Sequence, residues 1–571
     1  MNFVSRNKLM ILILLITLIK GIIWSYATPL FQAPDEQVHY ASVQYYAEPK
    51  GYEPKSYDFP LEKTDMFNLR TQNLSPELMN FLNKIQFEKV RFHKEKIQDF
   101  RRGAIDGSYE KDIRQSSLSR FVEQYPAWVI HYFAPYYQMV AGIENLTGNW
   151  SIIERVYWER LFSVVLLLLS VWLTYLMFLE LGLGKVTAAL VAGAVSFQPM
   201  LTFITGSINI DALLFAAFSL LLFGAVRFLG RGDDYISISC LLGGIIISVF
   251  SKPQGYFSLG LMVFLLVLFF VSRLRGYLKM NFKQKTVISI GLIFFLLAFS
   301  WLFYHVYQTI KDRYFPGSQS LSQLPAYIRH QMEYNVFYAH STFYWGNFGW
   351  LDTPFSQPLI WVIWAFLAAG IAGIILYFVK NIIYWKMLQD GERKFFYQLV
   401  FLILVVTGFF LMIHAVNFQQ VNPNNPADET NAIAIQGRYF FPVIGAKIFL
   451  VFIGLTVFID RISRFVIPAK AGIQKKIFEF SIMKKISFLL FGLMVLLNFI
   501  SLFAYLIPRF YLGDDTSYFS QELLDRMSQY KPVLLKEWVI VFVFILFLVL
   551  LVKFSFMTVK SYQNNPTNQN Q

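Results

Sequence analysis

The sequence predicts an all-α protein that crosses a membrane about twelve times and carries a large helical first outer loop. Hydrophobic residues make up 56% of its 571 positions and charged residues only 15%, whereas soluble domains carry about 25% charge. Apolar runs of roughly 20 residues, the length that spans a bilayer, recur along the chain. Lys and Arg concentrate in every second connection between them. These observations exclude a soluble enzyme and, despite the net charge of +14, a nucleic-acid-binding domain.

The apolar runs define the expected membrane spans. In chain order they cover residues 9–26, 161–180, 186–204, 210–229, 235–250, 256–272, 286–307, 358–379, 396–415, 439–459, 486–506 and 538–555. The run at 235–250 is short for a span. The first run ends in bulky residues rather than in the small residues of a signal-peptide cleavage site, so we expect it to remain as an anchor.

The positive-inside rule orients these spans. If the first residues are cytoplasmic, the short inward connections carry more than twice as many Lys and Arg residues as the short outward ones. Both termini are therefore expected in the cytoplasm. The chain then divides into the N-terminus and first span (1–26), an extracytoplasmic loop with amphipathic helices (27–160), a transmembrane bundle with outer motif loops (161–459), a basic cytoplasmic loop (460–485), C-terminal spans (486–560) and a disordered tail (561–571).

Loop 27–160 is the large hydrophilic piece of the chain, and we expect it to be helical rather than a separate enzyme domain. Segment 75–77 (Ser-Pro-Glu) supplies an N-cap, a proline suited to the first helical position and an acid in the first turn. Apolar residues follow at helical spacing: Leu78, Phe81, Leu82 and Ile85. This pattern predicts an amphipathic helix that lies on the membrane or on the bundle.

The segment from Ala33 to Tyr40 follows the first span directly and carries an acid pair. Asp35 and Glu36 are adjacent, and His39 lies one helical turn beyond Asp35, on the same helix face. An outward carboxylate at the membrane surface can act as a general base toward an acceptor hydroxyl, or can hold a divalent cation. The alternative is an ordinary helix opening, because acids are favoured in a first turn.

Two further outer motifs open later spans. The segment at the entry to the eighth span could stack on sugar rings, or form part of an aromatic interface belt; its candidate residues are Trp345, Trp350 and Asp352. The segment that opens the tenth span contains an arginine that can clamp a phosphate with two hydrogen bonds, or anchor the helix at the interface; its candidate residues are Gln436, Arg438 and Tyr439.

The remaining polar signals are weaker. Polar helix ends on the outer side supply further candidates, which are Arg160, Asn209, Asp211 and Lys252. Lys20 and Lys447 stand inside spans, where a central charge costs about 2.5–3.5 kcal/mol on insertion scales. We expect Lys20 to extend outward and Lys447 to face protein or a cavity. The single cysteine excludes an intramolecular disulfide, and no nucleotide-binding loop is present.

In their order along the chain these motifs resemble those of a bacterial family of predicted polytopic membrane proteins of unknown function. That family is allied to the GT-C glycosyltransferases, which include the protein O-mannosyltransferases and the lipid A aminoarabinose transferase. The resemblance covers about residues 30–445. It rests on the acid pair, on segments 160–163 and 197–199, on Asn209 and Asp211, and on segments 346–352 and 436–442. Segment 133–137 (Phe-Ala-Pro-Tyr-Tyr) departs from the family pattern, so its tyrosines are left out of the predicted site.

The resemblance implies a GT-C-like fold and a reaction. A sugar would pass, with inversion, from a polyprenyl-phosphate donor to a glycan, lipid or protein acceptor on the outer face of the inner (plasma) membrane. Asp35 would be the catalytic base, and Glu36 would orient it or help to bind a divalent cation, the one candidate cofactor. Arg438, with Lys252 or Arg160, would neutralise the departing phosphate, and the other candidate residues would bind substrate.

A transporter or flippase of lipid-linked glycans is the alternative, and a glycan polymerase is a third option. Transporters typically contain repeated halves, broken helices and a binding site near the midplane of the membrane. Here no internal repeat is visible, and the polar motifs gather on the outer side. This arrangement favours the enzyme.

Overall fold

The structure is a computed structural model. It describes residues 7–48, 73–85, 87, 108–122, 135–232, 234–267, 304, 308, 321–333, 336–420, 436–466, 480–512, 517–518 and 520–563.

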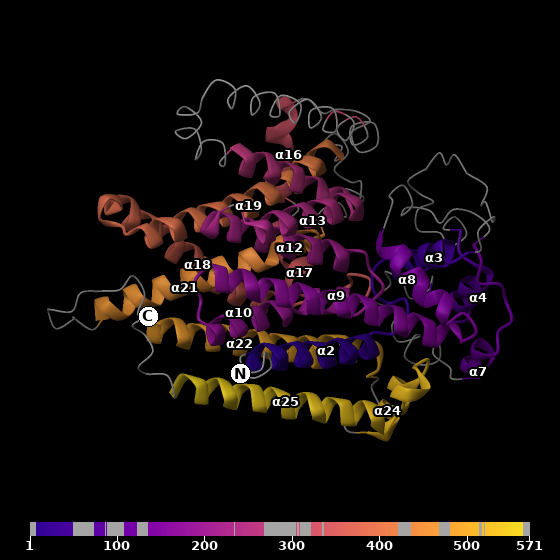
Figure 1. The fold of residues 1–571 in the computed structure, drawn as a ribbon. Helices are drawn as coiled ribbons and strands as arrows, with labels where there is room; N and C mark the ends of the chain where they lie inside the picture. Colours follow the sequence, from indigo (N-terminus) through magenta and orange to yellow (C-terminus); the bar gives the residue numbers. More distant parts are fainter. Residues whose placement is uncertain are drawn as a thin grey trace.

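Long apolar helices lie side by side and form most of the molecule (Figure 1). They are α2 (Lys8–Ala27), α9 (Ile152–Glu180), α10 (Lys185–Ser196), α12 (Asp211–Arg231), α13 (Tyr235–Ser251), α18 (Gln357–Ile383), α19 (Asp390–Gln420), α21 (Ile444–Val466), α22 (Phe480–Ile500) and α25 (Trp538–Gln563). Among the described residues, eight helices are long and apolar enough to cross a membrane, or up to nine if one bent pair counts as a span. An all-α polytopic membrane protein is therefore confirmed.

The expected count of twelve spans is not reached in the described part of the chain. Helix α13 has 17 residues, and the apolar helix Pro253–Val267 that follows it is also short. The run expected at 286–307 falls, apart from residue 304, outside the described residues, as does the end of the run at 256–272. Length and composition thus support fewer complete crossings than the hydropathy pattern predicted.

The expected span at 186–204 is broken. Helix α10 ends at Ser196, and α11 (Pro199–Thr205) leaves it at 66°. Pro199 cannot continue α10 because it lacks an N–H group, and the Gln198 side chain caps α11 by accepting from Leu201 N. Lys20 does not extend outward as we expected. It is buried at this break, donates to the Ser196 carbonyl and lies 3.0 Å from Thr202 Oγ1.

Four shorter helices gather at one end of the bundle: α3 (Glu36–Tyr46), α4 (Pro76–Lys84), α7 (Ser108–Arg114) and α8 (Pro135–Leu146) (Figure 1). The first residues of α2 and the last residues of α25 lie at the opposite end. The described parts of segment 27–160 therefore form a helical cap over the bundle end that lies opposite the first residues of α2 and the last residues of α25. The described elements of this segment are helices, while its assignment as an extracytoplasmic loop stays a prediction.

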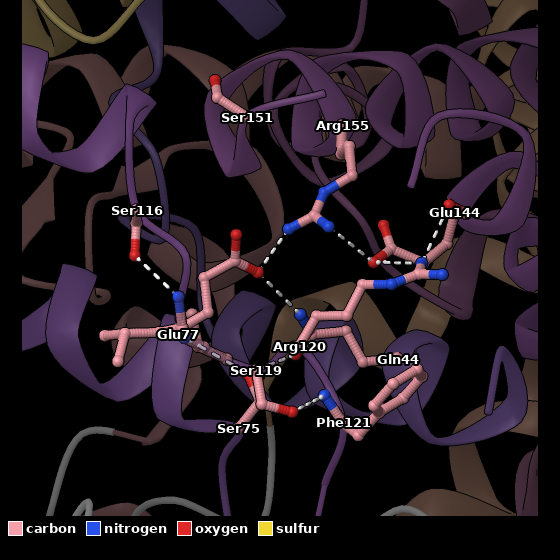
Figure 2. Close-up of polar contacts among 12 residues, drawn as sticks. Gln44, Ser75, Glu77, Ser116, Ser119, Arg120, Phe121, Glu144, Ser151 and Arg155 are labelled. Carbon is pink, nitrogen blue, oxygen red and sulfur yellow. Dashed lines mark hydrogen bonds and ion pairs between the residues drawn. The ribbon is translucent and has the colours of Figure 1, made fainter. Parts of the chain in front are cut away.

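Helix α4 matches its prediction in detail. Ser75 Oγ accepts from Leu78 N at 3.2 Å, and Pro76 occupies the first turn. Its apolar side chains are buried in a core shared with α3, α8 and the start of α9, so the helix packs on protein. Figure 2 shows the polar side of this packing, where Glu77 pairs with Arg155 and Arg155 pairs in turn with Glu144 at 3.2 Å.

Four of the five most exposed tryptophans among the described residues lie toward the cap end of the bundle, and the fifth, Trp172, lies in the middle of α9. Trp150, Trp158, Trp361 and Trp538 each keep roughly half of their surface exposed and stand at or near the helix ends on that side. Tryptophan favours the level of the lipid headgroups. The grouping of exposed tryptophans is therefore typical of helix ends at a membrane surface.

The other described elements are short. They are η5 (Pro253–Tyr256), η6 (Leu321–Gln323), α16 (Leu324–Glu333), α17 (Val336–Trp345), the two-stranded antiparallel pair β1 (Asn347–Phe348) and β2 (Thr353–Pro354), η7 (Trp385–Met387), η8 (Gly437–Val443), η9 (Ser501–Leu506), α23 (Ile507–Phe510), α24 (Gln521–Ser528) and η10 (Val533–Leu535).

Candidate functional site

Asp35 is the N-cap residue of α3, but its carboxylate does not cap that helix. Its backbone is left-handed (φ 65°), and its side chain accepts no hydrogen bond from the helix N–H groups. A capping residue normally has an extended backbone. Instead, Asp35 Oδ2 accepts from Arg438 Nη2 at 2.6 Å, and 40% of the Asp35 side chain remains exposed. The carboxylate thus faces a cation and solvent, which the helix-opening interpretation does not predict.

Arg438 is fixed by the glycine before it. A Cβ atom at Gly437 would lie 2.1 Å from the backbone nitrogen of Tyr344, so only glycine allows η8 to press against α17. This contact holds the Arg438 backbone beside the cap. The Arg438 side chain is only 4% exposed. The Gln-Gly-Arg motif therefore places a buried guanidinium next to Asp35.

A second acid and a second cation complete the cluster. Lys252 follows α13 in a tight turn, where a Cβ atom at Gly255 would meet the Ser248 carbonyl at 1.8 Å. Its Nζ lies 2.5 Å from Asp211 Oδ1, and Asp211 Oδ2 lies 4.0 Å from Arg438 Nε. We call Asp35, Arg438, Asp211 and Lys252 the outer cluster. Its charges alternate, so each cation is flanked by acid.

Two further predicted residues join the outer cluster. The Arg438 guanidinium lies 5.8 Å from the centre of the Tyr439 ring, and the Lys252 ammonium 5.7 Å from it. Asn209 Oδ1 accepts from Asp211 N at 2.9 Å. The structure therefore brings together candidates that are more than 400 positions apart in the sequence.

His39 lies one turn beyond Asp35 on α3, as predicted, and contacts a residue that the prediction left out. Its Nδ1 is 2.6 Å from the Tyr137 hydroxyl, and the two rings stack. Next to it, the Tyr136 hydroxyl accepts from Asn209 N at 3.0 Å. The Tyr-Tyr pair was discounted because segment 133–137 departs from the family pattern. The two adjacent tyrosines, Tyr136 and Tyr137, are the sequence feature from which both could have been predicted as site residues.

The ionisation of the two α3 groups follows from their surroundings. Burial raises the pKa of Asp35, but the charges of Arg438 and Lys252 and the hydrogen bond from Arg438 together outweigh it, so the net pKa lies below its ordinary value. Burial lowers the pKa of His39 to about 3. At neutral pH the site therefore holds an ionised Asp35 beside a neutral imidazole.

Glu36 occupies a different environment from its neighbour. Its two oxygens accept from Arg160 Nε at 2.7 Å and Nη2 at 2.6 Å, and also from the backbone N–H groups of Phe31 and Ile208. Glu36 and Arg160 are both fully buried. Arg160 also donates to the carbonyls of Ser25, Thr28 and Pro29. The pair fastens the turn between α2 and α3, so these two candidates lie under the outer cluster rather than in it.

With this geometry in view, the comparison with known families is informative. The sequence model of a family described as a predicted membrane protein (DUF2142) matches residues 18–446. The chain belongs to the DUF2142 family. The matched region contains the whole outer cluster and the Glu36–Arg160 pair. No curated protein and no solved structure shows significant similarity to the chain.

The DUF2142 region also contains the Trp345–Asp352 motif, whose residues lie apart from the outer cluster. Both tryptophans are buried rather than part of a surface belt. Trp350 donates from Nε1 to the Phe31 carbonyl at 3.2 Å, so it supports the turn that carries Asp35. Asp352 pairs at 2.5 Å with Arg509, which lies beyond the matched region.

Trp345 lies near the intramembrane lysine of α21. Lys447 Nζ is 3.6 Å from the centre of the Tyr344 ring and 5.9 Å from that of Trp345. Lys447 thus faces protein, as expected, and its charge rests on an aromatic surface. Gln436 is also buried, and its backbone carbonyl accepts from Tyr439 N at 3.0 Å.

Several polar atoms of the outer cluster have no hydrogen-bond partner within the part of the chain that the structure describes. They are Arg438 Nε and Nη1, Asp211 Oδ2 and Asn209 Nδ2. Buried donors are normally paired. A planar guanidinium with spare N–H groups suits an anion with several oxygens, such as a phosphate.

Among the described residues, no three His, Cys, Asp or Glu side chains are grouped to hold a metal ion. Two hollows lie elsewhere on the bundle, one lined by Lys20, Trp24 and Asn498 and another by Phe499, Phe503 and Tyr518. Neither is lined by Asp35 or Arg438. The chemical features of the outer cluster, rather than a deep hollow, make it the candidate site of this DUF2142 protein.

Proposed function

We propose that this protein is an integral-membrane glycosyltransferase. It moves a sugar from a polyprenyl-phosphate donor to a cell-envelope acceptor on the outer face of the inner membrane. One observation carries the proposal: a half-exposed, ionised Asp35 touches a buried Arg438 that retains spare donors. A carboxylate and a phosphate-binding cation side by side are what sugar transfer from a lipid phosphate requires.

The chemistry follows from the positions of these groups. Asp35 accepts the proton of the acceptor hydroxyl while that oxygen attacks the anomeric carbon of the donor sugar. The bond from this carbon to the phosphate oxygen breaks, and the lipid phosphate leaves with the bonding electrons. Arg438 and Lys252 neutralise the charge that develops on the phosphate. Attack opposite the leaving group inverts the anomeric centre.

The arrangement assigns supporting roles to the other candidates. Glu36 and Arg160 hold the turn that carries Asp35, since all their contacts are within the protein. Arg160 therefore does not reach the phosphate in this mechanism. Asp211 keeps Lys252 and Arg438 in place, and Tyr137 orients His39 beside Asp35.

The proposed orientation has both termini in the cytoplasm and a GT-C-like topology of about twelve spans. The first residues of α2 and the last residues of α25 lie opposite the cap, and four exposed tryptophans stand near the cap end. These features support a reaction at the outer headgroup level. A lipid-borne donor would present its phosphate there while its tail stays in the bilayer.

The decisive test is Asp35→Asn in a strain whose own gene is deleted. Sugar transfer should fall by about 10²–10⁴-fold, the loss expected when a general base is removed. Mass spectrometry of envelope glycans and lipid-linked sugars measures it. Asp234→Asn is the matched control, because Asp234 also pairs with an arginine, Arg227, at the other end of α12. Normal glycans in the Asp35→Asn strain would refute the proposal.

A transporter of lipid-linked glycans remains a second candidate because of the broken span. Helices α10 and α11 meet at an angle with Lys20 buried at the break, and broken helices are frequent in transporters. Purified protein in liposomes separates the two functions. An enzyme releases free polyprenyl phosphate when an acceptor is present, whereas a transporter moves the intact lipid-linked sugar between leaflets.

A further inference from the structure

The Asp35–Arg438 contact has an unusual feature for an active site, since its base and its phosphate-binding cation neutralise each other. Arg438 Nη2 donates to Asp35 at 2.6 Å, and Arg438 Nε and Nη1 have no hydrogen-bond partner among the described residues. A phosphate that approaches Arg438 therefore meets a cation already bound by a carboxylate. The donor and Asp35 compete for the same guanidinium.

The backbone at Asp35 is held by contacts other than the one with Arg438. Asp35 has φ 65°, a left-handed conformation that is uncommon for residues other than glycine. Such conformations persist where surrounding contacts impose them. Here the buried Glu36–Arg160 pair and the Trp350 contact to the Phe31 carbonyl fix the turn on both sides. The Asp35 side chain is 40% exposed, and its departure would remove the contact that ties the start of α3 to Arg438.

Asp211 keeps the guanidinium in place during such an exchange. It lies 4.0 Å from Arg438 Nε and is itself held by Lys252 at 2.5 Å. Arg438 would thus remain fixed when Asp35 departs, and its spare N–H groups would meet the phosphate oxygens. The freed carboxylate would lose its strongest neutralising partner, and its affinity for a proton would rise.

We propose that the Asp35–Arg438 ion pair is a latch that the donor phosphate opens, so that the base becomes active only after the lipid phosphate has bound. The inference rests on the proposed function, because it takes the donor to be a polyprenyl phosphate. The latch would suppress deprotonation of acceptors or water before a donor is present. It also sets an order of binding, with donor before acceptor.

The test measures binding by the full-length protein in detergent, with farnesyl phosphate as the lipid probe and inorganic phosphate as the free anion. Asp35→Asn removes the competing charge and should bind farnesyl phosphate roughly tenfold more tightly than the wild type. Asp35→Glu keeps a carboxylate and should stay close to the wild type. Asp234→Asn controls for loss of an arginine-paired acid elsewhere and should show no gain.

The outcomes distinguish a lipid phosphate from a free phosphate as the ligand, and they distinguish the latch from the transferase proposal. An equal gain for inorganic phosphate supports a latch that the phosphate alone opens; a gain confined to farnesyl phosphate supports one that needs the lipid. Unchanged or weaker binding of farnesyl phosphate by Asp35→Asn overturns the latch. Because binding needs no acceptor, a gain in affinity in Asp35→Asn, together with no sugar transfer by the wild type, would leave the latch standing and refute the transferase proposal instead.

A second measurement on the wild type covers the case in which Asp35→Asn does not fold. Hydrogen exchange is followed in peptides containing residues 33–40 and 437–443, with and without farnesyl phosphate. An opened latch should speed exchange at the start of α3 while it slows exchange around Arg438. Slower or unchanged exchange at residues 33–40, together with protection around Arg438, would contradict the latch.

Discussion

Asp35 and Glu36 are adjacent acids, and each pairs with an arginine, yet their environments differ in every other respect. The Glu36–Arg160 pair is fully buried, and each Glu36 oxygen accepts two hydrogen bonds. Asp35 is half exposed and makes one hydrogen bond to an arginine that keeps spare donors. A saturated pair holds structure, whereas an unsaturated pair leaves capacity for a ligand.

The buried network of Figure 2 follows the same distinction. Arg155 pairs with both Glu77 and Glu144, and Arg120 contacts Glu144 as well. These charges join α4, α8 and α9 inside the cap. Charge alone therefore does not identify the site in this protein. What distinguishes the outer cluster is the number of donors and acceptors that the protein leaves unused there.

The largest expected effect comes from Glu36→Gln. It leaves Arg160 fully buried without its carboxylate, and breaking a buried ion pair in this way costs about 3–5 kcal/mol. We expect little folded protein or a strongly lowered melting temperature, measured by thermal unfolding in detergent. Asp35→Asn makes the same chemical change one residue earlier and serves as the control. Equal destabilisation by both substitutions would erase the distinction between the two pairs.

Much of the fold was predictable because hydropathy and helix capping are local properties. The spans at 9–26, 210–229 and 358–379 correspond to α2, α12 and α18, and Ser75 caps α4 as its neighbours suggested. The break between α10 and α11 was not predicted, although Pro199 marks it. Apolar residues continue on both sides of Pro199, and a hydropathy pattern gives no information on the direction of the helix axis, so the bend could not be predicted from it.

The site was predictable as a set of residues but not as a set of partners. The positive-inside rule predicted that Asp35, Asp211 and Arg438 share one side of the membrane, the outer side. Which acid meets which arginine depends on how distant helices pack, so nothing local could assign Arg438 to Asp35 and Arg160 to Glu36. Tyr137 was missed for the same reason: its contact with His39 joins residues 98 positions apart and depends on helix packing.

A change in pH dependence is the next largest expected effect. Because Arg438 is the main charge that holds the pKa of Asp35 below its ordinary value, Arg438→Gln should leave burial dominant and raise that pKa. The base works only when deprotonated, so residual transfer should fail at a higher pH than in the wild type as the medium is acidified. The pH profile of sugar transfer by purified protein measures this shift.

The free energy of unfolding should also fall as the medium is acidified, because the Asp35–Arg438 contact needs an ionised carboxylate. A carboxyl group whose folded pKa is depressed stabilises the protein above its unfolded pKa, about 3.9, and this contribution is lost as the pH falls through the folded value. The wild type should therefore keep the Asp35 contribution at every pH above about 4, and Arg438→Gln should lack it. If sugar transfer by Arg438→Gln declines at the same acidic pH as in the wild type, Arg438 does not set the ionisation of Asp35.

The smallest expected effect is that of a chelator. A divalent cation shared by Asp35 and Glu36 would need free oxygens on both, but the four hydrogen bonds to Glu36 leave it none. Arg438 and Lys252 already supply positive charge where a cation would otherwise neutralise phosphate. Sugar transfer by purified protein should therefore change less than twofold, roughly 0.4 kcal/mol of barrier, when EDTA is added. If EDTA abolishes sugar transfer and Mg²⁺ or Mn²⁺ restores it, the Glu36–Arg160 pair must open during the reaction. The difference between the environments of Asp35 and Glu36 would then hold only for the protein without substrate.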